Sequence, residues 1–259
     1  MMTRKLTWIP DVPDQRDYSF NQIIDQNLQT YTIKTTDLPP SVNLRKYCPE
    51  IEDQQTLGSC VSNSMVGLFE FNRIKSGMGG KNFKNFSRLF NYYNSRLLID
   101  TISEDSGTDM RTAIKTAKLN GICLAEEWPY RLEYWKNEPP TKCYQSALNY
   151  RVKSYYRLNT LEEMKLSLYN KQPFIFGISV YRSFLTNNGI IPMPSITEKM
   201  LGGHAVMCIG YDDTTQMFLV RNSWGKNWGI NDSNLKGYCW MPYAYLESRN
   251  LSDDFWTIL

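Results

Sequence analysis

Hydrophobic positions between about residues 59 and 120 recur at steps of three and four, which is the spacing of one face of an α-helix. Val61, Met65 and Leu68 begin the first of these runs. Ser and Thr side chains favour helix starts, whereas Gly favours helix ends. These signals predict helices from Ser59 to near Ser76-Gly77, from Ser87, from about Thr108 to Asn120-Gly121, and after the capping box of Thr160 and Glu163.

Beyond Pro173 the pattern changes to short runs that are apolar throughout or alternate between apolar and polar residues. Runs of this length and character are typical of β-strands. They predict strands over residues 174–180, 205–211, 217–220 and 238–241. A chain with helices first and strands second is expected to be an α+β protein with two lobes.

The first 36 residues follow neither period, and Pro10, Pro13 and three nearby aspartates indicate an extended arm. The Pro39-Pro40 pair disfavours helix on both sides and marks a boundary. We therefore divide the chain into the arm, residues 1–36, and a main domain, residues 37–259, with a helical lobe mainly over 50–150 and a β-rich lobe mainly over 151–250.

Composition excludes several classes of protein. The net charge of +3, from 29 basic and 26 acidic residues, contains no dense basic block and argues against nucleic-acid binding. One histidine and six cysteines without a Cys-x-x-Cys pair argue against structural zinc and multi-histidine metal sites. We expect no metal and no cofactor.

The segment Met1–Pro10 lacks the roughly 7 to 15 apolar residues of a signal peptide, and no later stretch approaches the ~18 needed to span a membrane. We expect a soluble intracellular protein whose thiols stay reduced. Cys48, Cys208 and Cys239 are then inert core residues. Cys123 and Cys143 could form a disulfide or remain free thiols.

Three separated segments offer the groups that thiol chemistry requires. Cys60 stands in the first turn of a predicted helix whose positive end lowers a thiol pKa, behind the tight-turn residue Gly58 and the helix-start residue Ser59. His204 begins an apolar strand, and Asn222 follows the next one. Taken singly, each has an ordinary structural interpretation: an inert thiol, a core histidine and a turn residue.

Together, the segments Gln54–Cys60, Gly203-His204-Ala205 and Asn222-Ser223-Trp224-Gly225 resemble the papain family of cysteine peptidases, the family of the cathepsins. The separation of Cys60 and His204 lies within the family range of about 130 to 150 residues. The resemblance runs from about Leu38 to about Tyr245. It implies a two-lobe papain-like fold, in which a helical lobe is followed by an antiparallel β-barrel-like lobe and the active-site cleft lies between them.

The resemblance assigns Cys60 as the nucleophile and His204 as its ion-pair partner and as the proton donor to the leaving amine. Asn222 would orient the imidazole. Gln54 would hold the tetrahedral oxyanion together with the backbone N–H of Cys60; one such donor typically contributes ~10²- to 10³-fold in rate.

The resemblance also implies supporting and substrate-binding residues. Trp224 would cover the contact between His204 and Asn222, and Trp228 would lie on the leaving-group side of the cleft, although both are equally good core residues in isolation. The backbone of Gly107 would pair with an extended substrate. Ala205 and Gly177 would line the main specificity pocket and leave it roomy for an apolar side chain.

The chain also departs from the family pattern. Leu57 replaces a cysteine three residues before Cys60, so a customary disulfide is missing, and Val61 replaces an aromatic residue, as in microbial or viral relatives. Gln55 replaces a common glycine. An arm of this length is too short for the long helical propeptide of the cathepsin L type. The arm is therefore either a belt on the second lobe or a segment in the cleft that keeps a zymogen latent.

The resemblance predicts a thiol endopeptidase that acts on proteins or peptides, because a single histidine excludes the paired-histidine loop of cathepsin B-type exopeptidases. Two alternatives remain: a catalytically silent peptide-binding relative, and an acyl or peptide transferase that uses the same acyl-enzyme. We expect a monomer without membrane or nucleic-acid partners, in the cytoplasm, or in the virion or host cell if the protein is viral.

Overall fold

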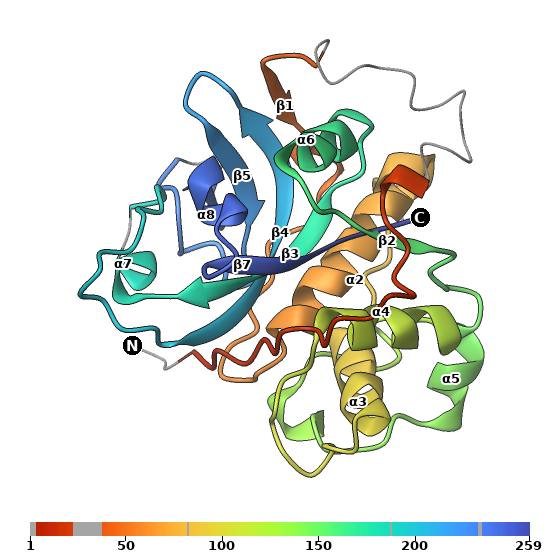
Figure 1. The fold of residues 1–259 in the computed structure, drawn as a ribbon. Helices are drawn as coiled ribbons and strands as arrows, with labels where there is room; N and C mark the ends of the chain where they lie inside the picture. Colours follow the sequence, from red (N-terminus) through yellow and green to blue (C-terminus); the bar gives the residue numbers. More distant parts are fainter. Residues whose placement is uncertain (1–3, 23–37, 82, 187, 233–234) are drawn as a thin grey trace.

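The computed structural model describes residues 4–22, 38–81, 83–186, 188–232 and 235–259. The helical lobe contains α2 (Cys60–Arg73), α3 (Arg88–Leu98), α4 (Met110–Leu119) and α5 (Thr141–Ala147). Helix α2 packs against α3 and α4 on one side and against the sheet on the other (Figure 1). The order of a helical part followed by an antiparallel sheet agrees with the α+β chain predicted from the sequence.

Local signals explain where these helices begin and end. The Ser87 hydroxyl accepts a hydrogen bond from Phe90 N (3.1 Å), and Asp109 caps α4 through Thr112 N (2.8 Å). Past α2, a wider helical turn (Ile74–Met78) ends at Gly77, which has a φ of +92°. Ser59 occupies the start of α2 but does not cap it with its side chain.

Within the described residues, the sheet has seven strands in the order β2-β7-β3-β4-β5-β6, with β1 paired to β4, and all pairings between them are antiparallel. The predicted strands correspond to β3 (Phe174–Val180), β4 (Gly202–Asp212), β5 (Met217–Arg221) and β6 (Tyr238–Pro242). The sequence analysis did not identify β1 (Ser41–Asn43), β2 (Tyr155–Arg157) and β7 (Ser252–Ile258). Because no ladder among the described residues joins β2 to β6, the sheet is open rather than a closed barrel.

The β-rich lobe also contains three short helices: α6 (Leu161–Tyr169), α7 (Arg182–Leu185) and α8 (Tyr243–Glu247). One large apolar core joins α2 to the sheet, and Trp256 of β7 is among its largest fully buried side chains. A smaller apolar cluster lies inside the helical lobe and includes Leu57. No helix in the described part of the chain is long and apolar enough to cross a membrane.

The described part of the arm, residues 4–22, crosses the body from β4 to the start of α4 (Figure 1). Thr7 forms a parallel bridge with Gly203 of β4, and Trp8 forms one with Thr108. The arm therefore contacts both lobes, and farther along it also pairs with β2 through Ser19 and Arg157.

Farther along, the arm is held by a cluster of charges that we call the clasp: Asp11, Asp17, Arg111, Arg157 and Asp254. Arg111 of α4 binds Asp17 through two nitrogens (2.8 and 2.5 Å). Arg157 of β2 binds Asp254 of β7 (2.7 Å), and Asp254 accepts a hydrogen bond from Asp11 N (2.7 Å). The clasp thus joins the arm to both lobes.

Candidate active site

Cys60 is the first residue of α2, so its thiol lies at the positive end of a long helix. The thiol is fully buried, with the backbone of Ala205 and the backbone and side chain of Thr7 as its polar neighbours. Ala205 directly follows His204, so the predicted nucleophile lies near the strand that contains the predicted base. Burial raises the pKa of the Cys60 thiol, and these polar neighbours oppose that rise.

His204 lies on β4 and is held by the loop that follows β5. Its Nε2 donates to Asn222 Oδ1 at 2.8 Å, since a carbonyl oxygen can only accept. Asn222 Oδ1 also accepts from Ser223 N (2.8 Å), which fixes the orientation of the amide. The Nδ1 atom is buried and has no hydrogen-bond partner among the described residues.

The indole of Trp224 lies against the imidazole of His204. Its ring stacks on His204 with centroids 4.6 Å apart and planes 30° apart. An aromatic face in this position excludes water from the bond between His204 and Asn222.

The side chain of Gln54 is fully buried next to the loop before Cys60. Ser223 Oγ donates to its Oε1 (2.8 Å), which leaves Nε2 as the end that faces the loop; Nε2 donates to Leu57 O (3.0 Å). The Tyr130 hydroxyl donates to Gln54 O (2.8 Å) and pairs with Ser59 Oγ (2.7 Å). These bonds orient the amide that the sequence predicts as an oxyanion donor.

A chain of hydrogen bonds connects the Cys60 loop to the predicted substrate-binding wall. Gly58 N donates to both oxygens of Asp105 (3.0 and 3.2 Å), Tyr92 OH donates to Asp105 Oδ1 (2.5 Å), and Gly107 N donates to Tyr92 OH (3.2 Å). We call this the Asp105 relay. It joins the loop that contains Leu57, where the family has a cysteine, to the Gly107 wall by polar contacts within the helical lobe.

The arm fills the space between these groups. Thr7 Oγ1 donates to Gly58 O (2.7 Å), Trp8 N donates to Gly203 O (3.0 Å), and Ile9 N donates to Thr108 O (3.3 Å). Cβ atoms built at Gly107 and Gly203 would lie 2.0 Å from Thr7 O and 2.5 Å from Trp8 O. Only glycines allow the arm to approach this closely.

The Trp8 indole occupies the predicted specificity pocket. Gly177 and Ala205 face each other across β3 and β4, and a Cβ at Gly177 would lie 1.9 Å from the indole. Trp8 is only 8% exposed, and its Nε1 has no hydrogen-bond partner among the described residues. The pocket therefore accepts a large flat side chain that needs no polar partner.

The docked arm also changes the electrostatics of the pair. Burial lowers the pKa of His204 to about 4, an effect that the bond to Asn222 opposes and the Arg4 charge reinforces. Because burial raises the pKa of Cys60 at the same time, the thiol and the imidazole are both neutral in this state.

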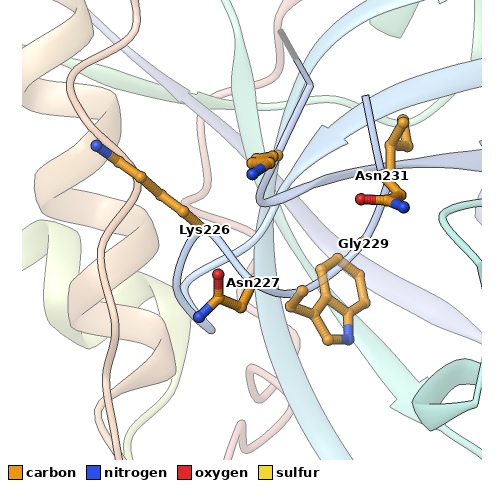
Figure 2. A pocket seen from close by; sticks show the side chains of 7 residues that line it. Lys226, Asn227, Gly229 and Asn231 are labelled. Atoms are coloured by element: carbon orange, nitrogen blue, oxygen red, sulfur yellow. The ribbon is translucent and has the colours of Figure 1, made fainter. Parts of the chain in front are cut away.

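Trp228 lies against Phe184 and Trp224, with centroids 5.4 Å from each ring. It also lines a cavity of about 170 Å³ between Lys226, Asn227 and Asn231 (Figure 2). The aromatic contact places Trp228 beside the ring that covers His204, next to the site but without a contact to Cys60 that would define its role.

Sequence reasoning missed several residues of this site. Ser223 and Tyr130 stood inside recognised motifs, yet their hydrogen bonds to Gln54 have no sequence signal. Asp105 and Tyr92 are separated in the sequence and meet only in the fold. The arm residues Arg4, Thr7 and Trp8 lacked a periodic pattern. All six cysteines are free, so Cys123 and Cys143 are not bridged.

A family model with the description "Papain family cysteine protease" matches residues 38–248. A peptidase C1-like protein of Acanthamoeba polyphaga mimivirus, L477, is 34% identical over 282 aligned positions, which cover 99% of this chain and 87% of the relative. Cathepsin B-like CP2 of Giardia intestinalis is 28% identical over 217 positions, covering 77% of this chain and 69% of the relative.

Solved structures give the same similarity. Xylellain, a cysteine protease from Xylella fastidiosa, matches with a TM-score of 0.84 and 35% identity, covering 100% of this chain and 98% of that one. Procathepsin B S9 from Trypanosoma congolense matches with a TM-score of 0.75 and 18% identity, covering 98% and 86%, and shows the fold alone. The match to xylellain includes the arm, whereas the family match begins at residue 38.

Proposed function

The chain belongs to the papain family of cysteine proteases, and we propose that it is an active thiol endopeptidase whose nucleophile is Cys60 and whose base is His204. The observation that carries this proposal is the bond from His204 Nε2 to Asn222 Oδ1 (2.8 Å), which leaves Nδ1 for a thiol at a helix N-terminus. An inert core histidine would have both ring nitrogens satisfied.

In the proposed reaction, the Cys60 thiolate attacks the carbonyl carbon of the peptide and a C–S bond forms. The electron pair of the C=O bond moves to the oxygen, which accepts hydrogen bonds from Gln54 Nε2 and Cys60 N. Collapse of this intermediate breaks the C–N bond, and the His204 imidazolium protonates the leaving amine. Water then attacks the carbonyl carbon of the thioester while His204 accepts a proton from it. The C–S bond breaks, which releases the acid and restores the thiolate and the imidazolium.

We extend the proposal to the arm: residues 4–9, which we call the cleft segment, keep the enzyme latent. Thr7 donates to Gly58 O in the loop before the nucleophile, and Trp8 fills the pocket over Gly177. Docking removes water from Cys60 and His204, so it suppresses the ion pair as well as blocking substrate. The arm thereby takes the place of a longer inhibitory propeptide.

The substrate-binding assignments form part of the same proposal. The main chain of Gly107 and the pocket between Gly177 and Ala205 bind the acyl part of an extended peptide, with an apolar or aromatic side chain in the pocket. The pairing of Trp8 N and Ile9 N with carbonyls on both sides of the cleft supports this, because an extended substrate needs similar partners. Trp228 is assigned to the leaving-group side.

The test uses the full-length chain with Trp8→Asp, which places a carboxylate in an apolar pocket and releases the cleft segment. We expect this variant to cleave internal bonds of quenched peptides. Cys60→Ala in the same background should reduce turnover by about 10⁴-fold or more with an unchanged thermal melt. Peptide binding without cleavage would instead indicate a silent relative, and product ligation to an added amine would indicate a transferase.

A further inference from the structure

Arg4 occupies a built site beside the catalytic residues. Its guanidinium forms an ion pair with Asp53 that uses both of its terminal nitrogens, one of them at 3.2 Å from Oδ2. It also donates to Gln55 O and to Trp224 O, each at 3.1 Å. A carboxylate and two main-chain carbonyls thus converge on one planar cation, the geometry that a guanidinium selects over an ammonium.

The surrounding loops hold these acceptors in place. Asp53 Oδ1 accepts from Gln55 N (2.8 Å), and Gln55 adopts a left-handed φ of +55°. Asp53 also forms a bridge with Trp224, and Gln54 N donates to Ser223 O (2.8 Å). The site therefore belongs to the body of the protein and does not depend on the arm for its shape.

The arm also defines the position of this site relative to the scissile bond. Thr7 lies at the loop that leads into Cys60, where its Oγ1 donates to Gly58 O (2.7 Å), while Trp8 and Ile9 follow the wall proposed for the acyl part of the substrate. Arg4 lies three residues away in the other direction, about 10 Å along an extended chain. Its acceptor Trp224 stacks on His204, the group that protonates the leaving amine.

We propose that Asp53, Gln55 O and Trp224 O form an arginine subsite on the leaving-group side of the cleft, which a substrate arginine enters once Arg4 withdraws. The inference rests on the proposed function, since it names a substrate class for that reaction. The enzyme then prefers peptides with an arginine a few residues after the cleaved bond.

The test requires an empty subsite in the full-length chain, so we combine Arg4→Ala with Trp8→Asp. Quenched peptides carry arginine or citrulline, its neutral isostere, at each of the first four positions after the scissile bond. We expect kcat/KM for arginine to exceed that for citrulline about tenfold at one position, because a charge-assisted hydrogen-bonded pair contributes about 1.5 kcal/mol or more. Equal rates at every position would overturn the proposal.

Asp53→Asn in this background should bring the arginine-to-citrulline ratio close to one, since the asparagine oxygen can still accept from Gln55 N. Glu50→Gln is the control: its carboxylate is 85% exposed and pairs with Lys226, so the ratio should persist. A ratio unaffected by Asp53→Asn contradicts the assignment.

The arginine subsite can be tested even if the protein turns out to cleave no peptide. If no peptide is cleaved, the same peptides are titrated by fluorescence anisotropy against the full-length chain that carries Arg4→Ala, Trp8→Asp and Cys60→Ala. Tighter binding of the arginine peptide that requires Asp53 supports the subsite even in a silent protein. Equal dissociation constants for arginine and citrulline reject it.

Discussion

The arm contacts the body of the protein in two places with different chemistry. The cleft segment uses main-chain hydrogen bonds and one apolar side chain, Trp8, at glycines that leave room for it. The clasp uses charges: the Asp11 carboxylate is fully buried, accepts from Trp256 Nε1 (2.8 Å) and Arg111 N (3.1 Å), and lies 3.4 Å from Arg157.

The two regions therefore have different tasks: the cleft segment blocks the proposed active site, and the clasp holds the arm on the body of the protein. The cleft segment covers polar groups that water can also solvate, so its release leaves the body intact. Release of the clasp exposes buried charges and the edge of the Trp256 core, so it must affect stability as well. Substitutions in the two regions should therefore have different combinations of activity and melting temperature.

The largest expected effect is that of Trp8→Asp. Loss of a buried indole and introduction of a carboxylate into its pocket should raise peptidase activity on the order of 100-fold, with little change in the melt of the body. Quenched-peptide assays and calorimetry measure the two quantities. Val12→Asp, at an arm position that is 78% exposed, is the matched control and should change neither.

Asp11→Ala should produce the second largest effect and should change both quantities. It leaves Trp256 Nε1 and Arg111 N without their acceptor, which we expect to lower the free energy of unfolding by about 2–4 kcal/mol and to raise activity roughly tenfold. Asp14→Ala is the control, because Asp14 pairs locally with the exposed Arg16. Activation without destabilisation would show that the clasp is not part of the core.

Tyr92→Phe tests the wall that the cleft segment covers. The change removes the hydroxyl that joins Asp105 to Gly107, so in the Trp8→Asp background KM for an extended peptide should rise about fivefold. Alkylation of Cys60 by iodoacetamide, which does not use Gly107, should keep its rate. Equal losses in both reactions would mean that the Asp105 relay only maintains the fold.

The smallest expected effect is a pH dependence of arm docking. Burial, followed by repulsion from Asp254, raises the pKa of Asp11 to about 7; Asp109 also opposes its charge, and the bonds from Arg111 and Trp256 favour it. Arg157, Asp17 and Asp253 complete its charged surroundings. Because the docked carboxyl binds a proton more readily than a free one, docking should weaken as pH rises through about 7.

Hydrogen exchange at Trp8 N and Ile9 N, corrected for the intrinsic rate, measures this docking. From pH 6.5 to pH 8 we expect protection to fall roughly fourfold, and Asp11→Asn should remove the change. Below about pH 6.5 the lowered pKa of His204 acts in the opposite direction, because the docked state disfavours the imidazolium. Protection that rises above pH 7 would contradict the direction assigned to Asp11.

The sequence predicted the helices and central strands well, because capping residues and apolar runs are local signals. It missed β7, where Asp253 and Asp254 interrupt the strand pattern, since those charges are satisfied by distant residues such as Arg157. The short strands β1 and β2 form through pairing with β4 and β7 and carry too few residues for a period.

The residues of the candidate site also fall into two groups: those that stand in a local sequence motif and those that only the fold brings together. Cys60, His204, Asn222 and Gln54 stood in recognisable motifs, and the fold brings their segments together. The fit of Trp8 over Gly177 could not be predicted, because it depends on a glycine in one lobe and an aperiodic arm far away in the sequence. Neither the clasp nor the arginine subsite has a local pattern.

In the proposed function, Cys60 is an activated nucleophile that the docked arm conceals. The most direct measurement is the rate at which a vinyl sulfone labels Cys60 at pH 7.5 in the native chain and in the Trp8→Asp variant, with mass spectrometry to identify the labelled residue. We predict slow labelling of the native chain and labelling of Cys60 alone, faster on the order of 100-fold, in the variant. Equal rates in the two proteins, or equal labelling of all six cysteines, would contradict the account.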